Sequence, residues 1–460
     1  MTLLEQCASW AADVHVDDLD ATSGQRARDG ITDCLGGALA AIGEPGPVAV
    51  WRFLELSGDC RADHEAALLG RGIRASAPNA ALHTGVLAHA LDYDDVAHPA
   101  NAHLTCSIVS ALLAVAPRRP PLGAGLLTAF AVGYEVAAKI GRALPRSERA
   151  GVWHPTGVLG VLGAAVAVAR ASGLPASQVA HAIGIAASLG SGLRGNLGSM
   201  TKPLHAGRAA QAGVTAARLA AGGFTASLDV LESRLGFLRQ YGRTDGGRDP
   251  VARAREQIAQ LGRPWELATD EGINIKLFPA CAGAQAGIEA ALAVRQRVGD
   301  DQIAAVRVGT PVTAPDVLIH HRPQLGVHGK FSMEYCVAAA LLHGRVGIDS
   351  FTDEAVTEPA VRAMIERVDM EIDARVAGST EHAAVVAVRT VSGAQYEELV
   401  ELAQGKPARW PRRDDLDAKF LDCAGRALGA AGARQALMLL RDETPDAAAE
   451  LDALLAGPVR

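Results

Sequence analysis

Several common signatures are missing from this 460-residue sequence. Its seven cysteines form no CxxC pair, and an odd set without close pairs argues against a disulfide framework and against an iron–sulfur cluster. HExxH is also missing, so we expect chemistry that needs no metal. The first residues contain no cationic segment leading into an apolar core, as a secretory signal would. Together these features predict a cytoplasmic protein without a metal site.

The charge balance narrows the choice of partner. The formal net charge is -7, and lysine and arginine form no dense cluster, so we expect neither nucleic acid nor an anionic membrane as the main partner. Uncharged runs such as 120–134 and 155–169 are too short, or too rich in glycine and proline, for a bilayer span of about 20 apolar residues. We therefore expect a soluble protein with a small-molecule partner.

The residue pattern predicts a mainly α fold in two domains. Residues 1–267 show helical periodicity, broken at 43–47, 117–121, 172–175 and 222–225, and predict a large all-helical domain. After that the pattern changes. Residues 268–404 predict a smaller α+β domain, with helices at 281–297, 332–343 and 356–367 and with β-branched strands at 303–310, 368–372 and 384–393. Residues 394–401 are the expected hairpin partner of the last strand, and 405–460 predict helices that return to the first domain.

One familiar motif is set aside. Residues 190–195, GSGLRG, fit the pattern GxGxxG of dinucleotide-binding folds. The preceding segment, ASQVAHAIGIAASL, predicts a helix where that fold requires a strand. We expect close packing or a turn at these glycines.

Residues 199–210, SMTKPLHAGRAA, predict a helix that starts with two cationic groups. Thr201 is expected to cap the helix, and Pro203 suits its first turn. Lys202 and His205 are i, i+3 neighbours at the positive end of the helix dipole, which disfavours cations. Either both reach solvent, or the free backbone N–H groups and the cation form an anion site.

A second irregular segment is HALDYDDVAHPANAH, residues 89–103. A helix that starts at Asn79 is expected to end in acidic residues, where the helix dipole is already negative. The segment contains Asp92, Asp94, Asp95, His98 and His103. It is either a solvated acidic loop, or a place where carboxylates set the tautomer and basicity of an imidazole.

Two further positions break local rules. His154 precedes Pro155 and should lie just before a helix, a location that favours the neutral form of its imidazole. It is either a proton acceptor or a buried structural histidine. Ser332 is expected to cap a helix whose first turn presents Tyr335, either a core aromatic or an acid. Lys276 lies just after the domain change. The four places together predict cations, imidazoles and a phenol that surround a polyanionic small molecule.

Five motifs in this order resemble the MmgE/PrpD (2-methylcitrate dehydratase) family. They are LHTGVLAHALDYDD (82–95), WHPTGVLGVLGAA (153–165), residues 198–225, IKLFPAC (275–281) and KFSMEYCVAAALLHGRV (330–346). The likeness extends over nearly the whole chain. It implies a large all-helical domain, a smaller α+β lid domain, a cleft between them, a homodimer, and no metal or organic cofactor.

The resemblance also implies functional residues. By position in the motifs, the catalytic residues are Asp92, His103, His154, Lys202 and Tyr335. The expected substrate-binding residues are Lys276, His205, Asp95, His98 and Cys281. The family's loop often reads HPS or HPG where this chain has His103-Leu104-Thr105, with His98-Pro99 displaced upstream, so either His98 or His103 is the cleft histidine.

Known members of the family catalyse different reactions on small di- or tricarboxylates. They include 2-methylcitrate dehydratase, iminodisuccinate epimerase and cis-aconitate decarboxylase. Decarboxylase-like members carry histidine where this chain has Cys281, so the resemblance places dehydration first, epimerisation second and decarboxylation third. A helical interaction scaffold is the non-enzyme alternative, and it predicts that the basic and imidazole side chains lie apart and exposed.

All three reactions create or collapse negative charge at a carbon next to a carboxylate, which requires a proton-transfer group and nearby cations. We expect Lys202 and its helix N-terminus to bind a substrate carboxylate, with Lys276 and His205 as further contacts. His103 or His154 would be the base. Asp92 would orient an imidazole or contact the substrate. Tyr335 would be the second acid if nearby lysines lower its pKa.

Overall fold

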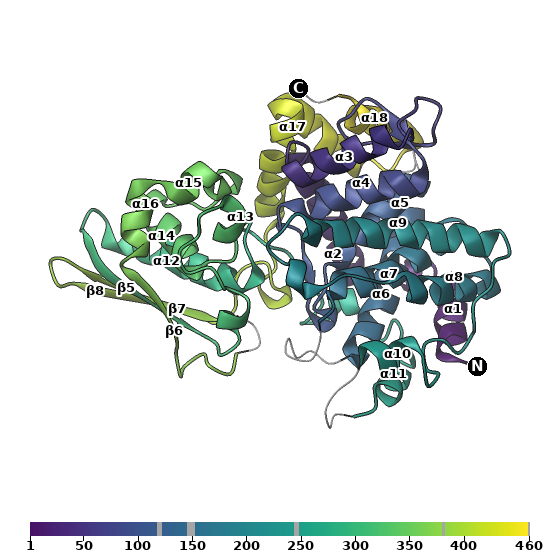
Figure 1. Ribbon diagram of the computed structural model, residues 1–460, viewed down its shortest axis with the longest axis horizontal. Coiled ribbons are helices and arrows are strands. Elements are labelled where there is room, and N and C mark those ends of the chain that lie inside the picture. Colours follow the sequence, from purple (N-terminus) through teal and green to yellow (C-terminus); the bar gives the residue numbers. More distant parts are fainter. Residues whose placement is uncertain (117–121, 145–151, 243–247, 380–381, 459–460) are drawn as a thin grey trace. The chain divides into compact units, whose positions relative to one another are not determined.

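The computed structural model describes residues 1–116, 122–144, 152–242, 248–379 and 382–458, so the break predicted at 117–121 lies outside the described residues. The chain forms two compact units (Figure 1). A helical unit consists of Met1–Ala90, Asp94–Ile275 and Arg412–Arg460. An α+β unit consists of Leu91–Tyr93 and Lys276–Pro411. The predicted mainly α fold with a smaller α+β part is confirmed.

The helical unit draws its helices from all three of its chain segments. Its helices are α1 (Leu3–Asp13), α2 (Ala21–Ala40), α3 (Pro45–Leu56), α4 (Ala77–Ala90), α5 (Leu104–Val115), α6 (Ala124–Ala143), α7 (Pro155–Ala171), α8 (Ala176–Leu189), α9 (Thr201–Ala221), α10 (Phe237–Tyr241), α11 (Pro250–Ile258), α17 (Arg413–Arg441) and α18 (Pro445–Ala456). Two short antiparallel strand pairs accompany them: β1 (Ala66–Ala67) with β2 (Arg74–Ala75), and β3 (Val96–Ala97) with β4 (Ile273–Asn274).

Small residues let α4, α7 and α9 approach closely at the centre of this unit. A Cβ atom at Gly85 of α4 would lie 2.7 Å from the Cα of Gly207 in α9, closer than side-chain atoms pack. A Cβ at Gly213 of α9 would lie 2.4 Å from the Cβ of Ala164 in α7. The glycines therefore bring together the three helices whose ends carry the site described below.

Helix α6 is the one helix of the described residues that is long and apolar enough to cross a membrane by length and composition. Its apolar window is 89% buried inside the structure. The helix also carries Glu135 and Lys139, which pair with each other at 3.7 Å. Burial by protein on this scale is what a core helix of a globular unit shows.

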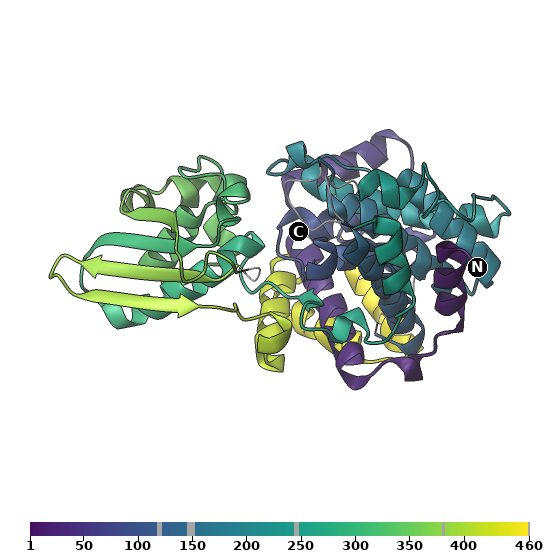
Figure 2. The same ribbon diagram turned by 90° about the horizontal axis from the view of Figure 1, so that it is seen from below.

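The α+β unit is a four-stranded sheet with helices against one face (Figure 2). The strands are β5 (Ile303–Thr310), β6 (Val368–Ile372), β7 (Ala384–Thr390) and β8 (Gln395–Val400), in the order β6-β5-β7-β8. Strand β6 is parallel to β5, and the other neighbours are antiparallel. Alternate residues such as Val306 and Val386 share a core with α12 (Gln285–Val298) and α14 (Met333–His343). The shorter helices are α13 (Gly326–Gly329), α15 (Asp353–Thr357) and α16 (Pro359–Ile365).

Several local predictions hold and others fail by a few residues. Strands 303–310 and 368–372 are confirmed, and the expected hairpin is β7–β8. Ser332 caps α14, because its side chain accepts from the Tyr335 N–H. Thr201 is not a cap: α9 begins at Thr201, and Met200 holds the cap position without a side-chain bond. The helix expected to continue to Asp92 ends at Ala90, so the acidic residues follow the helix.

Candidate active site

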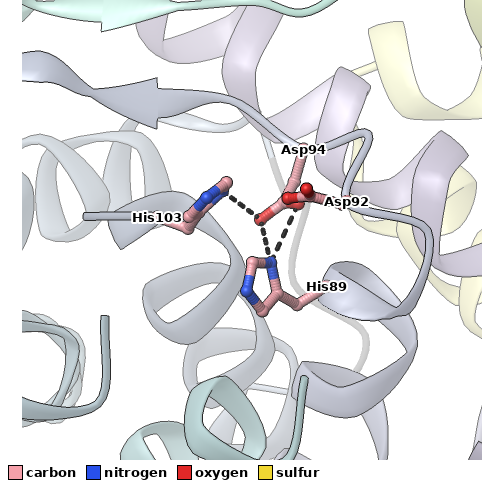
Figure 3. A group of neighbouring side chains, drawn as sticks. All are labelled: His89, Asp92, Asp94 and His103. Carbon is pink, nitrogen blue, oxygen red and sulfur yellow. Dashed lines mark hydrogen bonds and ion pairs between the residues drawn. The ribbon is translucent and has the colours of Figure 1, made fainter. Parts of the chain in front are cut away.

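Asp94, just beyond the end of α4, contacts two histidines in the helical unit (Figure 3). The Nδ1 atom of His89, in the last turn of α4, lies 3.0 and 2.9 Å from the two carboxylate oxygens. The Nδ1 atom of His103, which precedes α5, lies 3.0 Å from Oδ2. All three residues are buried. The arrangement is a carboxylate held between two imidazoles.

This arrangement determines the charge of Asp94. Burial alone would raise the pKa of the carboxyl group, but the two imidazoles outweigh that effect and hold the pKa well below its usual range. Asp94 is therefore ionised wherever histidine titrates. A buried carboxylate at this distance helps to orient an imidazole ring whose Nδ1 atom carries the proton.

The imidazole rings continue beyond Asp94 as a row of four. Ring centroids are 4.3 Å apart for His103 and His89, 6.1 Å for His89 and His154, and 5.2 Å for His154 and His205. The members come from α4, from the segment before α5, and from the starts of α7 and α9. His154 has the extended backbone expected of a residue before proline, with φ −89° and ψ 115°. The row thus joins segments that are far apart in the sequence.

His154 and His205 form a pair at the far end of the row. Their Nδ1 atoms are 3.0 Å apart, a distance that requires one ring to donate and the other to accept. Burial lowers the pKa of His154 well below its usual range, and the charges of His89, Lys202, His103 and His205 add to this effect. Burial, His89 and Lys202 also lower the pKa of His205. Both rings are therefore neutral at neutral pH.

Lys202 lies one residue into α9 and is buried. Its influence on the pKa values of His154 and His205 places its positive charge near that pair. Two of the backbone N–H groups expected to bind an anion at this helix start already have acceptors within the protein. The Thr201 N–H donates to Ser199 Oγ at 3.2 Å, the Lys202 N–H donates to the Ser199 carbonyl at 3.0 Å, and Pro203 has none. The ammonium and imidazole groups, rather than these two amides, are thus the candidates for binding an anion.

The glycine motif at 190–195 packs against this pair of histidines. Helix α8 precedes it, as the sequence predicted, so the setting is not that of a dinucleotide fold. The His154 N–H donates to the Gly192 carbonyl at 3.0 Å. A Cβ atom at Gly192, whose φ is +134°, would lie 3.0 Å from Cγ of His205. Only glycine allows the backbone to lie flat against that ring.

Asp95 and His98 have hydrogen-bond partners other than Asp94. Asp95 accepts a hydrogen bond from Thr105 at 2.8 Å. Burial, followed by the charge of Asp94, raises the pKa of Asp95 well above its usual range. His98 is half-buried at the start of a short 3-10 helix, and its N–H donates to the Gly272 carbonyl. His103 Nδ1 lies 3.0 Å from Asp94 Oδ2, and which of the two candidate histidines faces a cleft stays a prediction.

Four predicted site residues belong to the α+β unit. The Lys276 ammonium lies 2.7 Å from the Asp92 carbonyl oxygen and 2.9 Å from Asp92 Oδ1. Tyr335 is buried and its hydroxyl donates to the Ser350 carbonyl. Burial raises the pKa of Tyr335, so the expectation that lysines lower it is wrong. The Cys281 N–H donates to the Lys330 carbonyl. The roles predicted for these residues, and a cleft lined by both units, stay predictions.

His89 and Asp94 are the members of the site that sequence reasoning missed. From the sequence, Asp94 belongs to an acidic segment, but Asp92 and Asp95, not Asp94, are the predicted site residues. The available signal was a histidine in the last turn of a helix followed five residues later by a carboxylate. His89, Asp94 and His103 also offer ligand atoms within 4.8 Å of one another, a set that a transition metal ion could use. In the structure His89 Nδ1 is hydrogen-bonded to the Asp94 carboxylate, and His103 Nδ1 lies 3.0 Å from it.

Comparison with known proteins gives matches to two models of one protein family. The model of the MmgE/PrpD N-terminal domain matches residues 5–247, and that of the MmgE/PrpD C-terminal domain matches residues 278–443. Human cis-aconitate decarboxylase is 28% identical over 403 residues, which cover 84% of this chain and 81% of the relative. The cis-aconitate decarboxylase-like protein oryM of Aspergillus oryzae is 28% identical over 79% of this chain and 78% of its own length.

A more limited match is to the mitochondrial 2-methylcitrate dehydratase of Yarrowia lipolytica, 28% identical over 123 residues, or 25% of this chain and 23% of that protein. The named relatives are lyases by their descriptions, both decarboxylases and a dehydratase. The two family models together cover most of the chain and include every residue of the imidazole row. This chain therefore belongs to the MmgE/PrpD family.

Proposed function

We propose that this protein is a lyase that acts on a small polycarboxylate without a cofactor, and that its reaction is the decarboxylation of cis-aconitate or a close analogue. The observation that carries the proposal is the buried Asp94–His103 pair at 3.0 Å. It lies in one row with neutral His154 and His205 and near the charge of Lys202. A proton donor, a proton acceptor and a cation are the groups that this chemistry needs.

In the proposed step, His103 is the acid. The carbon–carbon bond to the leaving carboxylate breaks, carbon dioxide departs, and the electron pair stays on the substrate carbon, next to the double bond and a second carboxylate. The Nδ1 atom of His103 faces Asp94, so Nε2 is the atom that transfers a proton to that carbon. Asp94 stabilises the imidazolium before the transfer, and solvent then returns one proton to the ring.

Lys202, His154 and His205 bind and orient the substrate in this proposal. Cations placed where negative charge develops are among the largest contributions to catalysis in a buried site. The two neutral imidazoles donate or accept hydrogen bonds without adding a charge that would compete with the substrate. A carboxylate bound here offsets the positive charge of the Lys202 ammonium, which lies at the positive end of α9.

Decarboxylation replaces dehydration as the first choice because of the relatives. The cis-aconitate decarboxylases align over about four fifths of the chain, whereas the dehydratase aligns over a quarter. Dehydration of a 2-methylcitrate-like substrate stays the second candidate, and epimerisation the third. The observation that favours them is Cys281, which stands where the resemblance expects histidine in decarboxylases.

The test is a proton NMR assay in deuterated water with cis-aconitate, 2-methylcitrate, citrate and iminodisuccinate, combined with trapping of carbon dioxide. We expect cis-aconitate alone to release carbon dioxide, with one solvent deuteron incorporated per molecule of product. Water loss from 2-methylcitrate without carbon dioxide, or deuterium exchange into iminodisuccinate alone, would contradict decarboxylation and support the second or third candidate.

His103→Gln and His15→Gln are matched variants for this assay. Both replace a histidine by a neutral amide in the helical unit, but His15 is exposed and lies near the N-terminus, outside the row. Loss of a general acid costs about 10²–10⁴-fold in turnover, so His103→Gln should fall by that factor while His15→Gln keeps the wild-type rate. Equal rates for the two variants would remove His103 from the mechanism.

A further inference from the structure

The six lysines of this chain have an unusual distribution, because all of them are buried. They are Lys139, Lys202, Lys276, Lys330, Lys406 and Lys419. Arginine supplies the exposed cations, and exposed lysine, the commonest surface cation of most proteins, is missing here. A buried ammonium is costly unless it is hydrogen-bonded or paired. Each lysine is thus expected to hold a particular group in place.

Two of these lysines hold the same short turn within the α+β unit. The Lys330 ammonium donates to the Leu91 carbonyl at 2.7 Å. The Lys276 ammonium donates to both the carbonyl and the carboxylate of the next residue, Asp92, at 2.7 and 2.9 Å. The hydroxyl of the residue after that, Tyr93, donates to the Leu277 carbonyl at 2.9 Å. Three consecutive residues are therefore anchored by the same two segments.

The backbone of this turn needs such anchoring. Asp92 has a φ of +53°, in the left-handed region that residues other than glycine rarely occupy. Hydrogen bonds to an ammonium are charge-assisted and stronger than those between neutral groups. With bonds to the Asp92 carbonyl and side chain, and to the Leu91 carbonyl, the two lysines fix the peptide orientations on both sides of the left-handed residue.

The next residue of the chain after this turn is Asp94, the carboxylate between His89 and His103. We propose that Lys330 is a positioning residue for the Asp94–His103 pair, and that it acts by holding the turn Leu91–Tyr93. The inference rests on the proposed function, in which His103 is the acid. Lys276 holds the same turn, but Lys330 is the sharper test because neither the sequence motifs nor the resemblance gave it a role at the site.

The physical reason is the short stretch of chain between the turn and the Asp94 carboxylate. Only two residues, Asp92 and Tyr93, lie between Leu91 and Asp94, so a rotation of the peptides on either side of the left-handed residue moves the Asp94 side chain directly. Misplacement of a catalytic group by about 1 Å can cost about 10²-fold in rate. Loss of the Lys330 bond should therefore reduce kcat more than it changes KM, because the substrate-binding groups proposed for α7 and α9 are unchanged.

The experiment compares Lys330→Met, Lys330→Arg and Tyr93→Phe with the wild type. Two quantities are measured on the full chain: the low-field NMR resonances of imidazole N–H protons bound to a carboxylate, and kcat and KM with cis-aconitate. For Lys330→Met we expect those resonances to shift or broaden and kcat to fall about 10-fold or more. Lys330→Arg, which keeps a cationic donor, should restore part of the rate, and Tyr93→Phe should lose less than Lys330→Met.

The two readouts separate failure of this inference from failure of the proposed function. Shifted resonances in Lys330→Met support the positioning role even where cis-aconitate is not a substrate. Unchanged resonances and unchanged kcat in a folded Lys330→Met variant would overturn it. A Lys330→Met variant that does not fold leaves the decision to the other two: wild-type resonances and kcat in both would also overturn the proposal, and a graded loss would support it.

Discussion

Asp94 and Asp95 are neighbours in the chain, equally buried, and yet they lie in two chemically different regions. Asp94 faces His89 and His103, which hold its pKa well below the usual range. Asp95 accepts from Thr105, and burial together with the charges of Asp94 and Asp33 raises its pKa well above the usual range. We call these regions the imidazole side (His89, His103, His154, His205) and the α2–α17 side (Asp33, Lys419). Burial alone does not decide the charge of a carboxyl group; its partners do.

The α2–α17 side holds its own ion pair. Lys419 of α17 lies 2.6 Å from Asp33 Oδ1 of α2, and both side chains are buried. One ammonium near two carboxyl groups favours a single negative charge there, which is consistent with a protonated Asp95. Of the two neighbouring residues, Asp94 is therefore the ionised one, and it lies on the imidazole side, where the proposed chemistry takes place.

The largest expected effect comes from replacing Asp94 and, in a separate variant, Asp95 by asparagine. Asp94→Asn should lower kcat by about 10²–10⁴-fold, because the imidazolium of His103 loses its counter-charge. Asp95→Asn should keep a rate near that of the wild type, because an amide has the shape and the neutrality of a protonated carboxyl group. Steady-state kinetics of both variants checks this, and a larger loss in Asp95→Asn than in Asp94→Asn would reverse the comparison.

A lysine on each side sharpens the contrast. Lys202→Met should lower kcat/KM by about 10²–10³-fold with little change in the free energy of unfolding, because its charge serves the substrate. Lys419→Met should do the reverse and destabilise the fold by about 3–5 kcal/mol, because Asp33 loses its buried partner. Urea denaturation and kinetics on the same preparations distinguish the two. Wild-type turnover in Lys202→Met would exclude that residue from the mechanism.

A smaller effect is expected from the glycine loop on the imidazole side. Gly192→Ala should reduce kcat about 10-fold, because the new methyl group meets the His205 ring and the backbone has a φ of +134°. Gly195→Ala is the matched control in the same loop, since a Cβ atom there meets nothing within 4 Å. Kinetics and thermal unfolding of the pair check the prediction. Equal effects at both positions would show that contact with His205 is unimportant.

The smallest expected effect is on the pH dependence of stability, and it has opposite signs for the two carboxyl groups. The pKa of Asp94 is depressed in the fold, so its contribution is present above the ordinary value of 3.8 and is lost as the pH falls below it. The pKa of Asp95 is raised, so its contribution is full below 3.8 and is lost as the pH rises through the folded value.

Urea denaturation at several pH values measures these contributions. Relative to the wild type, Asp94→Asn should be most destabilised near neutral pH and least in acid. Asp95→Asn should become relatively more stable as the pH increases above about 4. Parallel curves for the two variants would mean that the neighbouring carboxyl groups titrate alike.

Much of the fold was predictable because its local patterns are strong. Alternating β-branched residues marked β5 and β6 to the residue, and the Gly and Pro breaks at 172–175 and 222–225 marked the ends of α7 and α9. The exact composition of each compact unit was less accessible. Residues 91–93 belong with 276–411 through contacts of Lys276, Lys330 and Tyr93, and contacts between distant segments leave no periodic trace in a sequence.

The site was predictable where a residue broke a local rule. His154 before proline, and Lys202 and His205 at a helix start, are brought near one another as a cluster by the fold. The choice among Asp92, Asp94 and Asp95 depends on the left-handed backbone at Asp92. Three similar carboxylates close together in the sequence do not reveal that backbone conformation. For Tyr335 the sequence could not show that burial outweighs any nearby cation.

The burial of every lysine has a practical consequence for labelling chemistry. All six lysines lie in the described part of the chain and are buried, so reagents that acylate primary amines do not reach their ε-amino groups in the native fold. Met1 at the N-terminus is exposed. Acylation of a lysine in the native protein therefore reports a local opening of the structure around it. The order in which the six become modified over time would rank the regions of the molecule by how readily they open.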